Sequence, residues 1–260
     1  MRKLCLDCFE GIPLEELLPL AKEAGFDGIY SSWIFADDPE AMMALKRRTD
    51  SLGLFYENAH STIPGTKQAW SPGPEGDAYT ETILRNLRNC AQAGVPMTVV
   101  HVETVADSDF HIGIRRMERI VEEAGRLGVQ VAFENCHDEE FLVRTLRHFA
   151  GVPHVGYCYD SGHEAFVTPG ARLLPQVGHR LLCTHLNDNY LDGDHHLIPG
   201  DGKIDFALAL RELKDTGYQG SINLEVNYNR YRESLTPKQF VDKCLACATA
   251  IRDYLDGPMQ

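Results

Sequence analysis

Histidine and acidic side chains crowd one short stretch of the chain, CTHLNDNYLDGDHHLIPGDGKID, at residues 183–205. It contains His185, His195 and His196 together with five aspartates. The apolar run LLCTHL precedes it and the amphipathic segment IDFALALRELKDTG follows it, so the cluster belongs to a strand end and the loop before a helix. Imidazole and carboxylate groups gathered at such a rigid position are typical of divalent metal chemistry.

The same pattern, an apolar run that ends in an acid or a histidine, recurs five more times along the chain. The residues concerned are His60, His101, Glu134, Asp160 with His163, and Glu225. A half-buried carboxylate without a partner is costly, and one divalent cation compensates several of them at once. A histidine alone at a strand end can equally be a hydrogen-bonded structural residue. For Glu134, Asp160, His185 and Glu225 as a set, we predict a site for Mn²⁺, Mg²⁺, Co²⁺ or Zn²⁺.

The apolar runs that carry these residues alternate with helical segments. They predict eight strands, at residues 3–9, 26–33, 54–60, 95–103, 129–135, 154–163, 180–188 and 220–226. Several boundaries look alike, such as KEAGFDGIY and GRLGVQVAFE, where a glycine ends a helix and a strand begins almost at once. Eight such units favour an α/β fold, a single (β/α)8 TIM barrel over residues 1–260. The alternative, an open doubly wound sheet, lacks support because no G-x-G-x-x-G or P-loop motif follows a strand.

In such a barrel the carboxyl ends of all eight strands meet on one face, and chemistry is carried there. We therefore expect Asp194 and His196, from the loop after the seventh strand, to join the strand-end residues. The loop 61–76 is the longest candidate lid. Trp33 and Trp70 either wall a pocket or pack in the core, and Asp138, Asp192 and His195 read as helix caps or solvated residues.

Composition narrows the class of protein. The 260 residues include 43% hydrophobic residues and carry a net charge of −13, which argues against a general nucleic-acid surface. The apolar runs are shorter than the roughly 18 residues of a membrane helix, and the N-terminal sequence lacks a signal-peptide pattern. We therefore expect a cytoplasmic protein without a membrane partner, in which the eight cysteines are reduced core thiols.

At these positions the chain resembles a known family. FEN at Glu134, YDSGH at Asp160, THLND at His185, DHHLIPGDGKID and LE at Glu225 are similar to the xylose-isomerase-like barrels. That superfamily holds sugar and sugar-phosphate isomerases and epimerases, together with the endonuclease IV group of DNA-repair enzymes. The H-L-x-P-G-x-G-x-I-D run from His196 is the most specific piece.

The resemblance implies roles for single residues. Those matching Glu134, Asp160, His185 and Glu225 hold one catalytic metal in the family, and Glu134 and Glu225 also serve as the acid and base of the epimerases. The residue matching His163 contacts substrate there. The family also implies a homo-oligomer, a dimer or a tetramer. One departure weakens a ketohexose epimerase assignment, because Tyr190 stands near a position where that branch usually carries an arginine.

The leading hypothesis is a divalent-metal-dependent isomerase or epimerase. It would act on a small sugar, a sugar phosphate or a related hydroxy-carbonyl through an enediolate. Five residues would bind substrate or a second metal: His60, His101, His163, Asp194 and His196. A dehydratase using the same site and a non-catalytic sugar-binding barrel stay open.

The alternative is a zinc-dependent phosphodiesterase of the endonuclease IV type that acts on abasic DNA. The endonuclease branch uses a larger set of ligands for three zinc ions, and this chain keeps all nine matching residues. The charge of −13 counts against it, because binding to a phosphate backbone needs several cations along a groove.

Overall fold

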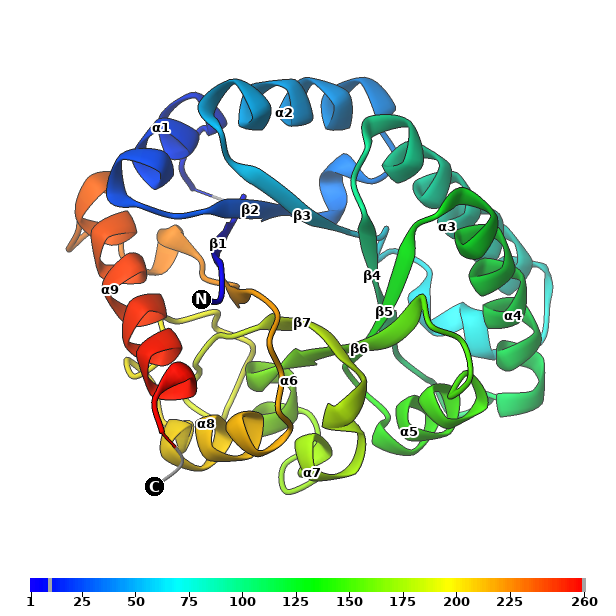
Figure 1. The fold of residues 1–260 in the computed structure, drawn as a ribbon. Helices are drawn as coiled ribbons and strands as arrows, with labels where there is room; N and C mark the ends of the chain where they lie inside the picture. Colours follow the sequence, from blue (N-terminus) through cyan, green and yellow to red (C-terminus); the bar gives the residue numbers. More distant parts are fainter. Residues whose placement is uncertain (9–10, 259–260) are drawn as a thin grey trace.

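The computed structural model describes residues 1–8 and 11–258, whose strands form a barrel inside a ring of helices (Figure 1). The strands are β1 (Leu4–Asp7), β2 (Gly28–Ser31), β3 (Phe55–His60), β4 (Met97–Val102), β5 (Gln130–Asn135), β6 (Val155–Asp160), β7 (Leu181–His185) and β8 (Ile222–Leu224). All eight predicted runs contain one of these strands. The first strand ends at Asp7, and the predicted extension to Phe9 lies outside the described residues.

Helices follow the strands in the predicted alternation. The α-helices are α1 (Leu14–Ala24), α2 (Pro39–Leu52), α3 (Pro74–Ala93), α4 (Phe110–Leu127), α5 (Glu139–His148), α6 (Ser161–Phe166), α7 (Leu173–Val177), α8 (Phe206–Asp215) and α9 (Pro237–Asp256). Short 3₁₀ turns are η1 (Trp33–Phe35), η2 (Thr66–Trp70), η3 (Gly178–Arg180) and η4 (Tyr228–Arg230). Pattern alone did not predict α6, a short helix that begins directly at the end of β6.

The strands are paired in parallel, in the order β7-β6-β5-β4-β3-β2-β1-β8. The two outer strands of this order approach each other at a parallel bridge between Leu186 and Leu224. There the Leu186 N–H donates to Asn223 O over 2.8 Å, and the Glu225 N–H donates to Leu186 O over 3.0 Å. These contacts bring β7 beside β8, so the sheet is a nearly closed barrel, as predicted, and the open doubly wound alternative is wrong.

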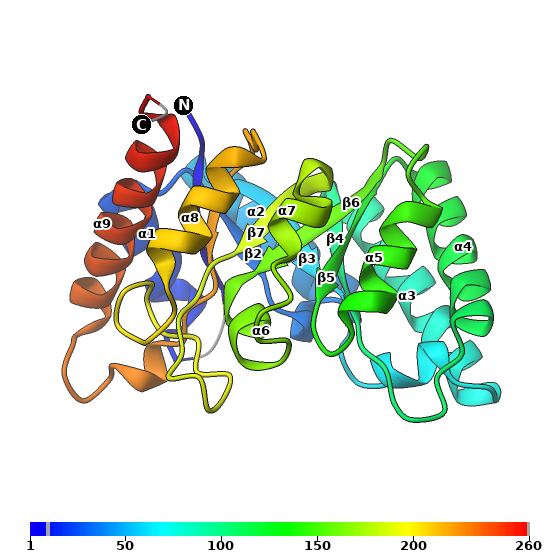
Figure 2. The same cartoon turned by 90° about the horizontal axis from the view of Figure 1, so that it is seen from below.

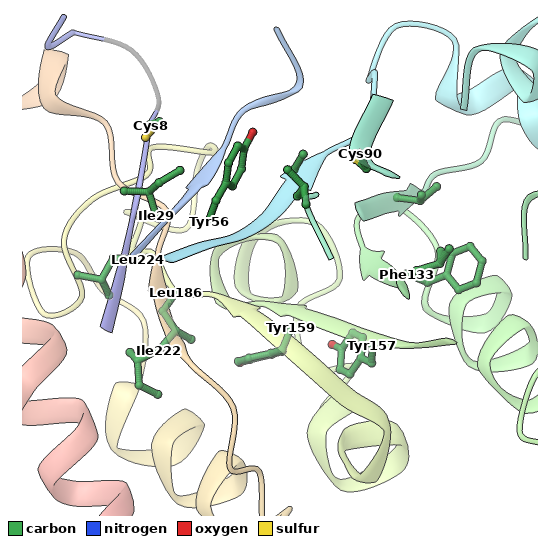
Figure 3. Packing of buried hydrophobic residues seen from close by; sticks show 14 of the residues in the cluster. Cys8, Ile29, Tyr56, Cys90, Phe133, Tyr157, Tyr159, Leu186, Ile222 and Leu224 are labelled. Carbon is green, nitrogen blue, oxygen red and sulfur yellow. The ribbon is translucent and has the colours of Figure 1, made fainter. Parts of the chain in front are cut away.

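Side chains on each strand alternate between the inside of the barrel and the layer under the helices. Met97, Val99, Ala132, Cys158 and Cys183 form an inner apolar cluster. Their neighbours along the strands belong to the larger core between strands and helices, of which Figure 3 shows Phe133, Tyr157 and Tyr159. All eight cysteines are unpaired and seven of them are buried, which agrees with the prediction that most are core residues.

The segment expected as a lid is more ordered than the sequence indicated. Helix α3 begins at Pro74, inside the expected loop 61–76, because proline suits the first turn of a helix. Trp70 is fully buried and stacks on Phe110 with ring centroids 5.9 Å apart. Trp70 therefore packs in the core rather than walling the pocket. Its contact with Phe110 holds this segment against α4.

The two ends of the barrel carry different parts of the chain. In Figure 2 both termini lie at the upper end, and the loop after β7 lies at the lower end with the other loops that follow strands. Among the described residues, no helix is long and apolar enough to span a membrane.

Candidate active site

The nine predicted site residues gather at the carboxyl ends of the strands. His60, Asp160 and His185 are the last residues of β3, β6 and β7. His101 and Glu134 are paired neighbours one residue before the ends of β4 and β5, and Glu225 directly follows β8. Because side chains alternate, His101, Glu134, Asp160 and His185 lie on the same side of their strands as the inner apolar cluster, one step farther along.

The four predicted metal ligands converge. Glu134, Asp160, His185 and Glu225 each offer a ligand atom, and these atoms all lie within 4.8 Å of one another. Nδ1 of His185 lies 3.1 Å from Oε1 of Glu134 and 3.2 Å from Oε2 of Glu225. Three carboxylates around one imidazole form a donor set that suits Mn²⁺, Co²⁺, Zn²⁺ or Mg²⁺.

A second group shares Glu134. Oε2 of this residue lies 3.1 Å from Nε2 of His60 and 3.3 Å from Nε2 of His101, and the two histidine nitrogens are 3.0 Å apart. Each oxygen of the Glu134 carboxylate therefore faces a different set of imidazoles. His60, His101 and Glu134 also each offer a ligand atom within 4.8 Å of the others.

The remaining three residues form a third group on the same face. Oδ2 of Asp194 lies 3.0 Å from Nε2 of His196 and 3.5 Å from Nε2 of His163. Nδ1 of His163 contacts the carbonyl oxygen of Asn135 over 3.0 Å, which fixes the orientation of the ring. The structure thus brings all nine predicted residues together.

Neighbouring amides hold Asp160, one of the predicted metal ligands, in position. Its Oδ1 accepts from the N–H of His163 over 2.6 Å and so caps α6. Its Oδ2 accepts from Nδ2 of Asn187 over 2.9 Å. Gly162 is required beside this amide, because a Cβ there would overlap Oδ1 of Asn187. Outer contacts of this kind orient a ligand and tune the metal that it binds.

The loop after β7 is organised by Asp188, which was not singled out as a site residue. Its buried carboxylate accepts from the backbone N–H groups of Gly200, Gly202 and Ile204 over 2.9 to 3.0 Å. A Cβ at Gly202 would overlap Oδ1 of Asp188, so the second glycine of the P-G-x-G run is required for steric reasons. This anchoring fixes the loop that carries Asp194 and His196, and His196 adopts a strained φ of 51°.

The close approach of three buried carboxylates shifts the pKa values within the four-ligand group. Burial, together with the charges of Glu225 and Glu134, raises the pKa of Asp160 well above its usual value. Burial opposes ionisation of Glu134 too, but the imidazoles of His185 and His101 hold its pKa well below the usual value. Conversely, Glu225 and Glu134 raise the pKa of His185 against the effect of burial. The group favours positive charge at its centre, which a divalent cation would supply.

These groups open into a pocket of about 200 Å³. It is lined by Ser32, Trp33, His60, Ile63, His101, His163, Asp194, His196 and Glu225. Trp33 therefore lines the pocket, which is one of the two roles expected for this residue. Ser32 and Ile63 were missed because a serine and an isoleucine after a strand carry no chemical signal of their own.

Asp7 was also missed as a site residue. It is the last residue of β1 and 5% exposed, and among the described residues both of its carboxylate oxygens lack a hydrogen-bond partner. Burial, with the nearby charge of Glu225, raises its pKa well above the usual value. An acid at a strand end was the signal used elsewhere, and the sequence LCLD contains it.

The residues set aside as caps or solvated groups lie apart from the pocket lining. Asp138 caps α5 by accepting from the N–H of Phe141 over 2.9 Å, as expected. Asp192 is exposed and lies 3.5 Å from Nε2 of His195. Tyr190 is 44% exposed, with its ring centroid 5.1 Å from that of His195.

Comparison with known proteins identifies the family. The model of the xylose isomerase-like TIM barrel matches residues 18–243. The chain belongs to the xylose isomerase-like TIM barrel family. The resemblance inferred from the site motifs is thereby confirmed.

Relatives and solved structures agree with this family. The uncharacterized protein y4fM of Sinorhizobium fredii is 31% identical over 165 residues, which cover 57% of this chain and 53% of that protein. The chain thus spans about half the length of this relative. A structure of the IOLI protein with a bound zinc atom has a TM-score of 0.78 at 17% identity, covering 96% of this chain and 98% of that one. D-psicose 3-epimerase with D-tagatose, from Clostridium cellulolyticum H10, has a TM-score of 0.79 at 14% identity, covering 98% and 100%. At these identities the likeness establishes a shared fold.

Proposed function

We propose that this protein is a divalent-metal-dependent isomerase or epimerase of a small sugar or a related hydroxy-carbonyl compound. The observation that carries the proposal is the convergence of Glu134, Asp160, His185 and Glu225 within 4.8 Å beside a pocket of about 200 Å³. Epimerases among the solved structures of this fold, and a zinc atom bound in another, are consistent with it.

The donor set fits a metal on its own chemistry. Three carboxylates and an imidazole at a common point leave net negative charge, and Nε2 of His185 is buried without a hydrogen-bond partner among the described residues. A divalent cation held by these four residues would polarise a substrate carbonyl and stabilise the charge of an enediolate.

The two glutamates would move the proton. Although burial raises the pKa values of both glutamates, His185 and its neighbours hold them below the usual value. Both carboxylates are therefore ionised at neutral pH and can act as a base. Glu134 and Glu225 both reach Nδ1 of His185. We assign removal of the proton next to the carbonyl to one of them and its return to the other.

The histidines of the pocket would orient the substrate. His101 and His163 line the pocket, and their rings meet edge to face with centroids 5.4 Å apart. Each presents ring nitrogens that bind hydroxyl groups. Trp33 and Ile63 add an apolar wall, which suits the carbon face of a sugar.

The test is exchange of substrate hydrogen with solvent. The Mn²⁺-loaded protein is incubated with a panel of aldoses, ketoses and keto-polyols in deuterated water, and deuterium incorporation is followed by mass spectrometry. Glu134→Gln and Glu225→Gln should each slow exchange by about 10²- to 10⁴-fold. Glu139→Gln, at an exposed position of α5, is the matched control and should leave the rate unchanged. Full turnover in both site variants would rule out this mechanism.

A zinc-dependent phosphodiesterase acting on abasic DNA is the second candidate. The convergence of all nine residues, with the His60–His101–Glu134 group beside the four-ligand group, favours it. Two features count against it: the net charge is −13, and the described residues that line the pocket include neither lysine nor arginine. Cleavage of an abasic duplex by zinc-restored protein would establish this activity, and its absence would remove the candidate.

A further inference from the structure

A further cluster of metal-binding side chains lies one step beyond the site, at the rim of β4 and β5. These strands pair His101 with Glu134 and Val102 with Asn135. Glu103 and Cys136 are the next residues along each chain, two positions beyond the paired His101 and Glu134. Both residues lie just beyond the ends of their strands, and their side chains approach that of His101.

The side-chain atoms of Glu103, Cys136 and the next residue, His137, are close together. Oε1 of Glu103 lies 2.8 Å from Nδ1 of His137, and Sγ of Cys136 lies 3.1 Å from the same nitrogen. His101, Glu103 and Cys136 also each offer a ligand atom within 4.8 Å of the others. An imidazole, a carboxylate and a thiol, from His101, Glu103 and Cys136, therefore converge, and His137 adjoins this group through its contacts with Glu103 and Cys136.

Burial makes this arrangement more than a surface polar cluster. Glu103 is 8% exposed and Cys136 is 5% exposed, whereas the side chain of His137 is 43% exposed and leaves the space open to solvent. Lys67 places a positive charge beside Glu103, because its Nζ lies 3.2 Å from Oε1 of that residue. Lys67 comes from η2 and is itself 45% exposed, so it can swing away from the carboxylate.

We propose that Glu103, Cys136 and His137, with His101, form a second divalent cation site that prefers zinc or cobalt. Cysteine, histidine and carboxylate ligands in a four-coordinate set are typical of zinc, whereas magnesium and manganese prefer oxygen donors. A thiolate and a carboxylate balance the two positive charges of the cation, and the thiol proton is released to solvent on binding. This donor set contains a sulfur atom, and the four-ligand group has none.

The two sites are coupled through His101. This residue belongs to the group with His60 and Glu134 and also to the group with Glu103 and Cys136. A cation at the rim would therefore compete for an imidazole that faces the pocket. Zinc in excess should weaken substrate binding through His101, while the metal at the four-ligand group stays in place.

Cobalt titration tests the site directly, because a thiolate bound to Co²⁺ gives a charge-transfer band in the near ultraviolet that oxygen and nitrogen ligands do not give. We expect this band when Co²⁺ is added to the protein. Cys136→Ser should abolish it, and Cys247→Ser, which changes a half-buried cysteine on α9, should retain it. His137→Gln, at a half-exposed position that tolerates substitution, should weaken Co²⁺ binding about tenfold or more.

Two further variants separate this site from its neighbours. His185→Gln disables the four-ligand group and should leave the sulfur band in place, so the rim site and the proposed function fail independently. Lys67→Met removes the competing ammonium and should tighten Co²⁺ binding several-fold. Absence of the band in wild-type protein, its survival in Cys136→Ser, or its loss in Cys158→Ser with retention in Cys136→Ser would each overturn the proposal.

Discussion

Glu134 and His185 meet at the centre of the barrel, where Oε1 of the carboxylate lies 3.1 Å from Nδ1 of the imidazole. The other oxygen of Glu134 faces His60 and His101 at 3.1 and 3.3 Å. A single carboxylate thus joins the four-ligand group to the histidines of β3 and β4. Both partners are fully buried, so water screens the interaction little. Removing either side chain would leave an unpaired buried charge and should destabilise the fold.

Removal of the metal should destabilise the protein. A ligand that binds only the folded state at 100 times its Kd adds about 2.7 kcal/mol of stability, which for a chain of this size corresponds to about 5 to 10 °C in Tm. We expect chelation to lower Tm by this amount and Mn²⁺ to restore it, as followed by circular dichroism. His185→Gln should abolish the response.

The matched control for this experiment is His148→Gln. His148 is half-exposed on α5 and contacts Glu118 over 2.9 Å, far from the ligand set in sequence. This variant should respond to chelation and Mn²⁺ as the wild type does. An unchanged metal response in His185→Gln would contradict the assignment of His185 as a ligand.

The metal-free protein should lose stability as pH rises above neutrality. Burial alone would lower the pKa of His196, but the hydrogen bond that it donates to Asp194 and the nearby acids raise it to about 9. A raised histidine pKa adds stability that is fully present below the unfolded value of about 6.5 and is lost as pH rises through 9. The free energy of unfolding should therefore fall by up to about 3 kcal/mol between these pH values.

Urea denaturation of chelator-treated protein at a series of pH values measures this slope. Asp194→Asn should flatten it, because the substitution removes the charge that contacts both His196 and His163. Asp192→Asn, which changes an exposed acid on the same loop, should keep the wild-type slope. Equal slopes in the two variants would show that Asp194 is not the source of the effect.

The fold could be predicted from sequence because its signals are local. Glycines in the left-handed conformation end α1, α2, α3 and α4, and the strands that follow begin within a few residues, so repeated boundaries indicated repeated units. Helix α6 could not be predicted in this way. It has six residues, and it exists because Asp160 caps it from the end of β6.

The site was predictable as far as its residue types were distinctive. Histidines and acids at strand ends implied a shared face, and the barrel brought all nine together. The contacts between groups could not be predicted, because they depend on the register between strands. Asp188 was overlooked for a related reason, since its partners are backbone N–H groups 12 to 16 residues away.

The loop after β7 should depend on Asp188. Asp188→Ala removes three part-buried hydrogen bonds to a carboxylate, from the N–H groups of Gly200, Gly202 and Ile204, each contributing about 1.5 to 3 kcal/mol. We expect a loss of at least about 3 kcal/mol in urea denaturation, with activity falling because Asp194 and His196 lose their support. Asp205→Ala is the control. It removes an N-cap that accepts from Leu208 alone in the described contacts and should cost about 1 kcal/mol. A similar loss in both variants would contradict the anchoring role.

Gly162 should tolerate no side chain. In Gly162→Ala the new Cβ overlaps Oδ1 of Asn187, and the displaced amide would release Oδ2 of Asp160, which it now contacts over 2.9 Å. Overpacking at such a position costs about 1 to 3 kcal/mol, and the metal affinity should fall about 10- to 100-fold because the ligand loses its support. Gly151→Ala is the matched control, since a Cβ there meets no atom within 4 Å and should leave both quantities unchanged. Isothermal titration with Mn²⁺ and urea denaturation measure the two effects. Normal metal affinity in a destabilised Gly162→Ala protein would mean that Asn187 supports the fold but not the ligand Asp160.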